Sequence, residues 1–225
     1  IPGTVGASPI QNIGAYGVEM CQRFHSLEAF DARSGEWRNL SREECRFGYR
    51  HSIFKETEGA GYIVVSVTFR LSRIPSLVID YGDIRTQLND SNITDPTPID
   101  VCNAVQTIRR QKLPDPTVEP NAGSFFKNPV LNKAQFTAFI ARHPKAPHYP
   151  QQDGSYKIAA GWLIDQLGWK GKNLGPVVVN QRQALVLINN GGGGRDILAA
   201  AEKIAASVYK FFGIQIEMEP RIIGD

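Results

Sequence analysis

Two prolines separated by one residue, in the segment Leu113-Pro114-Asp115-Pro116, most constrain how this chain of 225 residues folds. Proline has no amide hydrogen and disfavours helical backbone in the residue before it, so a helix that reaches Leu113 has to end there. Such a helix is predicted over Thr97 to Lys112, where apolar residues recur at three-residue spacing. The sequence therefore predicts two domains, residues 1–112 and 113–225, with a cleft between them, where small-molecule sites are common.

The first domain carries clear strand patterns. Apolar and polar residues alternate from Ser26 to Asp31, and a glycine turn leads into Trp37 to Leu40, which predicts a hairpin. Tyr62 to Leu71 is rich in β-branched residues and alternates, which predicts a further strand. Ser41-x-x-Glu44 has the form of a capping box and predicts a short helix after the hairpin.

The second domain mixes both patterns. Helices are predicted over residues 132–143, capped by Asn132, over Tyr156 to Leu167, and over Asp196 to Phe211. The last of these is expected to turn one apolar face inward and to end at Gly213; that face comprises Ile197, Ala201, Ile204, Val208 and Phe211. Strands are predicted over residues 177–179, 184–188 and 214–218. The expected fold class is α+β with two domains.

Charge and composition exclude several classes of function. The 25 Lys and Arg residues against 22 Asp and Glu give a net charge of +3, with no dense basic run. Nucleic acid is therefore not an expected partner, whereas an anionic small ligand suits this charge. No apolar stretch approaches the roughly 20 residues that a bilayer crossing needs, so no membrane association is expected.

The cysteines and histidines predict neither a disulfide framework nor a metal site. Cys21, Cys45 and Cys102 are scattered and odd in number, which is typical of free, mostly buried thiols in a reducing compartment. The four histidines show no paired ligand spacing, so no metal is expected. The start, Ile1-Pro2-Gly3, has neither an initiator Met nor a signal-peptide pattern, and a truncated chain is the expected explanation.

The segment from Asn121 to Asn128, Asn-Ala-Gly-Ser-Phe-Phe-Lys-Asn, is the strongest candidate for chemistry. It sets the hydroxyl of Ser124 behind a glycine and ahead of two aromatics, with a lysine and an amide nearby. An alcohol is a weak acid, so Ser124 suits a general acid only where the proton goes to a reactive carbanion or enol. Lys127 or Arg50 would then stabilise the alkoxide. Because Gly-Ser is also common in turns, a purely structural role stays open.

Two further charged groups are candidates. Arginine is the natural partner of a substrate carboxylate or a developing enolate, and either Arg46 or Arg50 could fill that role unless both are surface residues. Glu217 and Glu219 are two apart in an expected strand and would share a face. Like charges there can raise one pKa for acid–base work, but a solvated polar face is an equal alternative.

The run Gly191 to Gly194 is expected to form a turn. A phosphate-binding loop would need a lysine followed by Ser or Thr, and Arg195-Asp196 stands there instead.

Seven blocks of the sequence follow the order found in UDP-N-acetylenolpyruvoylglucosamine reductases, and the chain resembles that family along its whole length. The blocks are Ile1–Gly17, Cys45–Arg50 with Ser52–Lys55, Lys112–Pro116, Asn121–Pro129, Tyr149–Gln151, Ala159–Asp165 and Gln183–Asn189. The loop Asp80-Tyr81-Gly82 resembles the subclass in which a tyrosine loop closes over the substrate.

The resemblance implies a partial FAD-binding α+β domain over residues 1–112. It implies a smaller α+β substrate-binding domain over residues 113–225, whose C-terminal strand returns to the active site. The implied activity is an NADPH-dependent flavoenzyme that reduces the enolpyruvyl group of UDP-N-acetylglucosamine enolpyruvate to UDP-N-acetylmuramate, in the synthesis of peptidoglycan precursors. FAD and NADPH are the implied cofactors, and a cytoplasmic monomer is expected.

The resemblance also assigns roles to residues. It makes Ser124 the proton donor, with Arg50 and Glu219 flanking the reacting carbon and Glu217 a rival for the carboxylate. It brings Gly6, Ile10 and Gly14 to the flavin by their backbone and Arg221 to the flavin phosphates. It gives the uridine diphosphate part of the substrate to Tyr81, Lys112, Asn128, Tyr149, Lys170 and Gln183. The family's N-terminal flavin unit has no counterpart in these residues, so the alternative is a catalytically inactive nucleotide-sugar binding fragment without bound flavin.

Overall fold

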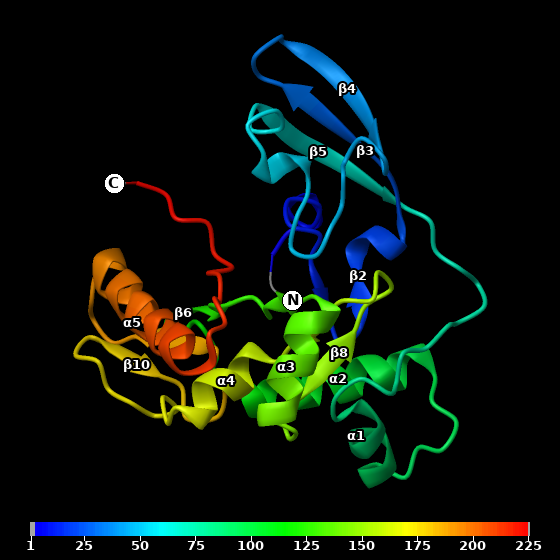
Figure 1. Ribbon diagram of the computed structural model, residues 1–225. Coiled ribbons are helices and arrows are strands. Elements are labelled where there is room, and N and C mark those ends of the chain that lie inside the picture. The colour runs from blue at the N-terminus through cyan, green and yellow to red at the C-terminus, as the bar shows by residue number, and fades with distance from the viewer. Residues whose placement is uncertain (1–2, 225) are drawn as a thin grey trace. The chain divides into compact units, whose positions relative to one another are not determined.

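The computed structural model describes residues 3–224, and the chain divides into two compact units, Ile1–Ile108 and Arg109–Asp225 (Figure 1). Each unit contains helices and strands, so the predicted α+β class is confirmed. The assignment of residues 1–112 to a FAD-binding domain and of 113–225 to a substrate-binding domain stays a prediction. None of the helices within residues 3–224 is both long and apolar enough for a bilayer crossing.

The first unit is built on a three-stranded antiparallel sheet in the order β4-β3-β5. Its strands are β3 (Phe24–Asp31), β4 (Glu36–Ser41) and β5 (Tyr62–Phe69). The predicted hairpin and the predicted third strand are thus confirmed, although the third ends before Leu71. One face of the sheet covers a core; its buried members are Phe24, Leu27, Ala29, Leu40, Cys45, Ile53 and Phe54.

Short elements and two helices complete the first unit. The short elements are the 3₁₀ turns η1 (Val5–Ala7), η2 (Met20–Gln22) and η3 (Ile53–Lys55) and the hairpin β1 (Gly14–Ala15) with β2 (Val18–Glu19). Helix α1 (Ile84–Asp90) was not predicted, whereas α2 (Pro98–Lys112) was. Thr97 caps α2 by accepting from the amide of Asp100 at 3.4 Å. The two helices bury apolar residues in a common small core.

The predicted helix at Ser41-x-x-Glu44 is wrong, although both bonds of the capping box form. The amide of Ser41 donates to Glu44 at 2.8 Å, and the amide of Glu44 donates to the Ser41 hydroxyl at 3.2 Å. The backbone then turns left-handed at Arg46, with φ of 48°. A left-handed residue cannot continue a right-handed helix, so the box closes a turn instead.

The second unit contains two small antiparallel sheets and three helices. One sheet has the order β10-β11-β6, from β10 (Val177–Val179), β11 (Val186–Asn189) and β6 (Asn121–Ser124). The other has the order β7-β9-β8, from β7 (Val130–Leu131), β9 (Tyr156–Ile158) and β8 (His148–Pro150). The helices are α3 (Lys133–Arg142), α4 (Ala160–Gln166) and α5 (Gly194–Phe212).

The predicted helices are confirmed at 132–143 and at 196–211 but wrong in part at 156–167. Asn132 caps α3 as expected, in a reciprocal pair with Gln135. Tyr156–Ile158 is instead the central strand β9, paired on both sides, and only the residues from Ala160 onward are helical. Tyr156 stacks on Phe136 of α3 with ring centroids 3.8 Å apart. The two residues are 20 positions apart, so no local sequence pattern predicts this contact.

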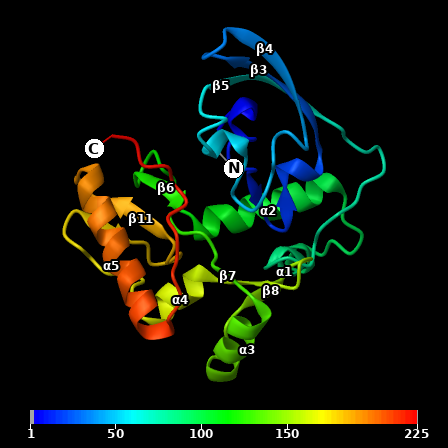
Figure 2. The same ribbon diagram turned by 45° about the horizontal axis from the view of Figure 1, so that its top comes forward.

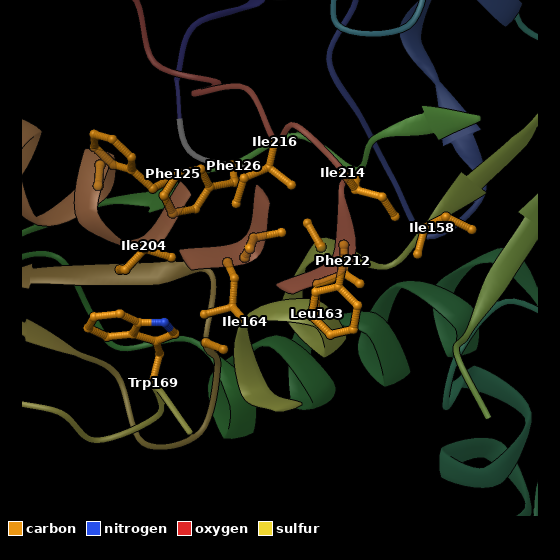
Figure 3. Close-up of a cluster of buried hydrophobic side chains, with 14 of the residues drawn as sticks. Phe125, Phe126, Ile158, Leu163, Ile164, Trp169, Ile204, Phe212, Ile214 and Ile216 are labelled. Atoms are coloured by element: carbon orange, nitrogen blue, oxygen red, sulfur yellow. The ribbon is translucent and has the colours of Figure 1, made fainter. Parts of the chain in front are cut away.

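The inward face of α5 differs from the prediction at its end. Ile204 and Val208 are fully buried and Phe212 is 4% exposed, whereas Phe211 is 65% exposed. Phe212 follows Val208 by four residues, which keeps it close to the same line along a helix with 3.6 residues per turn. Figure 3 shows Phe212 among the buried side chains of this unit, near Leu163.

The last predicted strand, over residues 214–218, is extended but forms only one isolated bridge, between Met218 and Phe126. Ile214 and Ile216 are buried, whereas Gln215 and Glu217 are exposed, so the predicted alternation is present. Figure 2 shows this red C-terminal segment passing beside β6. This segment therefore has the alternating burial of a strand but does not belong to a sheet.

The two adjacent phenylalanines of α5 give a test of this packing. Phe212→Ala should lower the free energy of unfolding by about 3–5 kcal/mol, because it removes a buried aromatic ring from the core. Phe211→Ala, which truncates a mostly exposed ring, should cost less than about 1 kcal/mol. Urea unfolding followed by circular dichroism measures both, and equal losses would contradict the assigned faces.

Candidate functional site

Ser124 ends strand β6 directly after a β-bulge. It pairs with Val186, whereas Asn121 pairs with Ile188, so β6 has one residue more than β11 between these pairs. Gly123 has φ of 72°, a conformation that favours glycine, and its amide donates to the side chain of Asn121 at 2.8 Å. Bulges re-aim the side chains beside them. The glycine before Ser124 is therefore required by the backbone that directs this hydroxyl.

The residues after Ser124 are held on two sides. The amide of Phe125 donates to Leu185 at 2.8 Å, and its carbonyl accepts from the amide of Glu219 at 2.8 Å. Phe125 and Phe126 are 5% and 1% exposed and lie in the core of the second unit (Figure 3). The Ser124 hydroxyl is partly buried and donates to no group within residues 3–224. Ser124 is thus fixed by its neighbours while its hydroxyl is not used in the fold.

The two glutamates near the C-terminus are not equivalent. Glu217 is 68% exposed in its side chain and forms an ion pair with Lys127, with Nζ and Oε2 2.8 Å apart. Glu219 is partly buried, and its backbone is bonded to the residue that follows Ser124. The structure therefore brings Glu219 next to the serine segment. Lys127, one expected partner of a Ser124 alkoxide, forms its ion pair with Glu217 instead.

Asn128 and Gln183 each lie close to the beginning of α4. The side-chain oxygen of Asn128 accepts from the amide of Ala160 at 2.9 Å. The side-chain oxygen of Gln183 would lie 3.2 Å from a Cβ added at Gly161, so the absence of a side chain there gives Gln183 its room. Both predicted substrate-binding residues are partly buried and belong to one small region of the second unit.

The remaining predicted substrate and cofactor residues of this part of the chain are more scattered. Tyr149 lies in β8, opposite Lys157 of β9. Lys170 forms an ion pair with Asp165 at 2.9 Å. Lys112 is the exposed last residue of α2, and Arg221 is exposed near the C-terminus.

Arg50 and Arg46 differ clearly in the first unit. Arg46 is paired with Glu56, at 3.3 Å, and with Glu58. Arg50 donates from Nη2 to the carbonyl of Gly14 at 2.8 Å and lies over the ring of Tyr49, with φ of 53°. Arg46 therefore belongs to a surface charge cluster, whereas Arg50 contacts the glycine-rich segment that was predicted to approach a flavin.

That glycine-rich segment is shaped by close backbone packing. A Cβ at Gly14 would lie 2.8 Å from the carbonyl oxygen of Val18, so no side chain fits there. A Cβ at Gly6 would lie 3.7 Å from the carbonyl oxygen of Val64, an ordinary van der Waals contact. Ile10 packs on the first core, and its carbonyl accepts from the hydroxyl of Ser52 at 2.6 Å. Ile1 and Pro2 lie outside the described residues.

Tyr81, the predicted lid residue, packs against the same segment. Its ring meets that of Tyr16 edge to face, with centroids 6.4 Å apart. A Cβ at Gly17 would lie 3.3 Å from the Tyr81 ring. Tyr81 thus rests on the turn that follows the predicted flavin-contacting residues.

The run Gly191–Gly194 forms the turn into α5, as expected. The amide of Gly192 donates to Asn189 at 2.7 Å and that of Gly193 to Asp196 at 2.8 Å. These two donors, which a phosphate loop would aim at its ligand, are satisfied by the chain itself.

Sequence reasoning missed Asn12. This residue is fully buried, and its amide group bonds to Cys21, Glu19 and Gly48. Nothing in its local sequence distinguishes it from any other loop asparagine. A signal would have required knowing that residues 10–14 and 48–52 lie together.

The sequence of this chain is similar to those of known proteins. Residues 115–223 match the family described as UDP-N-acetylenolpyruvoylglucosamine reductase, C-terminal domain. Proteins named UDP-N-acetylenolpyruvoylglucosamine reductase from Azoarcus sp. (strain BH72) and Chromobacterium violaceum are 54% and 52% identical to it, over 98% and 99% of the chain. The chain spans 63% and 66% of their lengths.

A solved structure extends the match to the fold. The crystal structure of UDP-N-acetylenolpyruvylglucosamine reductase from Thermus caldophilus matches with a TM-score of 0.60 and 22% identity, covering 98% of this chain and 60% of that one. The chain is thus an α+β protein with the fold of a solved reductase. Over the segment that it spans, its sequence is similar to proteins named UDP-N-acetylenolpyruvoylglucosamine reductase, the resemblance that the sequence blocks predicted.

The reactivity of the cysteines tests how tightly the segment Cys45–Arg50 is packed. Burial raises the pKa of the Cys45 thiol to about 12 and also raises that of Cys21, whereas Cys102 is exposed. Since the thiolate is the reactive form, only Cys102 should react quickly with a disulfide reagent at pH 8 in the folded protein. All three should react after unfolding.

Mass spectrometry of the labelled peptides identifies which thiol has reacted. Because Cys45 ionises first in the unfolded chain, its contribution to stability should decline as the pH rises from about 9 towards 12. Rapid labelling of Cys45 in the folded protein would show that the segment opens.

Proposed function

We propose that this chain carries the substrate-reducing site of a UDP-N-acetylenolpyruvoylglucosamine reductase, a cytoplasmic flavoenzyme of peptidoglycan precursor synthesis. The substrate is UDP-N-acetylglucosamine enolpyruvate, and FAD and NADPH are the cofactors. The observation that supports the proposal is the bulge at Gly123, directly before Ser124, together with the backbone bond from Glu219 to the next residue, Phe125. The similarity to proteins of that name supports it.

Reduction of the enolpyruvyl double bond adds a hydride to its terminal carbon and a proton to the carbon that bears the carboxylate. When bound, reduced FAD supplies the hydride. Negative charge then develops on the second carbon and on the carboxylate, and the protein has to stabilise it there. Ser124 holds the required proton at Oγ, because an alcohol can protonate a carbanion-like carbon although it is too weak an acid for most groups.

Arg50 is proposed to bind the substrate carboxylate. A guanidinium offers five donors in a planar fork, so its bond to Gly14 still leaves it suited to a carboxylate. That bond also fixes the orientation of the side chain before substrate arrives. Glu219 is proposed to flank the reacting carbon, since Glu217 is exposed and paired with Lys127.

The residues near Arg50 fit a flavin. Gly6, Ile10 and Gly14 lie on one segment and are proposed to approach the flavin by their backbone; no side chain fits at Gly14. Arg221 is proposed to reach the flavin phosphates. The uridine diphosphate part of the substrate is given to Tyr81, Lys112, Asn128, Tyr149, Lys170 and Gln183. Of these, Asn128 and Gln183 have the strongest support, because they are partly buried together at the start of α4.

Ser124→Ala tests the proton donor. In the flavin-loaded protein it should abolish substrate reduction, while stopped-flow reduction of the flavin by NADPH continues at its normal rate, because only the second step needs the proton. Thr137→Ala removes an exposed hydroxyl from α3 and should leave both steps unchanged. Near-normal turnover of Ser124→Ala would remove this residue from the acid role.

Arg50→Lys and Arg46→Lys form a matched pair. Lysine keeps the charge but loses the planar fork, so Arg50→Lys should lower kcat for substrate reduction by roughly 10²–10³-fold, the size of effect seen when one donor to a developing anion is removed. Arg46→Lys should change it by less than about 3-fold, since Arg46 pairs with exposed glutamates. The reverse ranking would move the role to Arg46.

A further inference from the structure

Two loops of the first unit are joined by three hydrogen bonds that involve side chains. The hydroxyl of Ser52 donates to the carbonyl of Ile10 at 2.6 Å, Asn12 Nδ2 donates to the carbonyl of Gly48 at 3.0 Å, and Arg50 Nη2 donates to the carbonyl of Gly14 at 2.8 Å. Residues 10, 12 and 14 on one loop thus bond with residues 52, 48 and 50 on the other. The two loops are separated by more than 30 positions in the sequence.

Asn12 is the buried member of this set. It is fully buried, its backbone is left-handed with φ of 48°, and its side-chain amide is bonded at each polar atom. The side-chain oxygen accepts from the amide of Cys21 at 3.0 Å, and Nδ2 donates to Glu19 Oε2 at 2.9 Å as well as to Gly48. Only one orientation of the amide satisfies these partners, because a flip would face its oxygen towards two acceptors.

The bond to Gly48 acts on the turn that carries Arg50. Gly48 and His51 exchange two backbone hydrogen bonds, at 3.0 and 3.2 Å, and so close a tight turn over Tyr49 and Arg50. Within it Arg50 has a left-handed backbone, with φ of 53°, that the surroundings have to enforce. Asn12 holds the base of this turn, while Gly14, two residues further along the same loop, receives the Arg50 side chain.

Glu19 sets the position of Asn12. Its Oε2 accepts from Asn12, and its side chain crosses Gly14 so closely that a Cβ there would lie 2.9 Å from its Cγ. The absent side chain of Gly14, the carboxylate of Glu19 and the amide of Asn12 therefore form one arrangement. A change in any of them reaches the Arg50 turn through the contact with Gly48.

We propose that Asn12 is a positioning residue for the reduction step, oriented by Glu19, and that it acts by holding the Arg50 turn against the glycine-rich loop. This inference rests on the proposed function of Arg50. Displacement of a catalytic group by about 1 Å can cost as much as 100-fold in rate, so a buried amide that fixes the base of its turn has a measurable part in turnover.

Asn12→Asp tests the proposal in two backgrounds. Aspartate keeps the size and the acceptor for Cys21 but faces an oxygen towards Glu19 and Gly48, which repels both. In the flavin-loaded protein with Arg50 intact, kcat for substrate reduction should fall about 10–100-fold. In the Arg50→Lys background the same substitution should cost less than about 3-fold, because it acts through the arginine. Bound flavin is measured by its absorbance in each variant, so that loss of cofactor is not counted as loss of turnover.

Asp31→Asn is the matched control, because it exchanges carboxylate and amide at another buried polar side chain of the same unit, at the end of β3. It should change kcat by less than about 2-fold in both backgrounds. If circular dichroism shows that Asn12→Asp does not fold, Glu19→Ala replaces it in the same two backgrounds. The expected loss of kcat is then smaller, with the same dependence on Arg50.

Equal losses in the two backgrounds, or no loss with Arg50 intact, would overturn the role of Asn12. Failure of the proposed function looks different: Arg50→Lys by itself would then retain normal turnover.

Discussion

The hydrogen bonding of Phe125 on both sides is the constraint on which the second unit depends. Its amide bonds to Leu185 and its carbonyl to Glu219, so a short segment lies between residues about 60 and 94 positions further along the chain. Burial of the two phenylalanines excludes water from these bonds, which makes them costly to break. This arrangement fixes the position of Ser124, because Ser124 immediately precedes Phe125. A serine in an ordinary exposed loop would have no such constraint.

Local patterns predicted the elements whose stability is local. Periodicity, or a cap within a few residues, predicts three such elements: the hairpin of β3 and β4, the capped helix α3 and the long amphipathic helix α5. The capping box at Ser41 does not start a helix because Arg46 turns left-handed, and Tyr156–Ile158 is not helical because it pairs with β7 on one side and β8 on the other. The first failure has a local cause in the backbone, whereas in the second, pairing with other strands overrode the local helical signal.

The candidate site shows the same division. Short motifs predicted Ser124, Arg50 and the resemblance to the reductases, and the roles of the two residues stay predictions. The choice between Arg46 and Arg50, and between Glu217 and Glu219, needed the partners that only coordinates supply. Asn12 could not be found at all, since its importance comes from burial and from three partners, one of them 36 positions away. The amino-acid composition gives no information about such a contact.

The two units hold their proposed site residues by different physical means. In the second, apolar side chains and strand pairing place Ser124, so its geometry depends on volume and on the glycine of the bulge. In the first, buried polar side chains and left-handed backbone place Arg50, so its geometry depends on charge and on hydrogen-bond direction. Left-handed residues other than glycine cost of order 1–3 kcal/mol each and persist only where neighbours enforce them. Asn12, Tyr16 and Arg50 all have such backbone within two loops, which is the pattern expected where a fold gives up stability to fix the direction of a functional group.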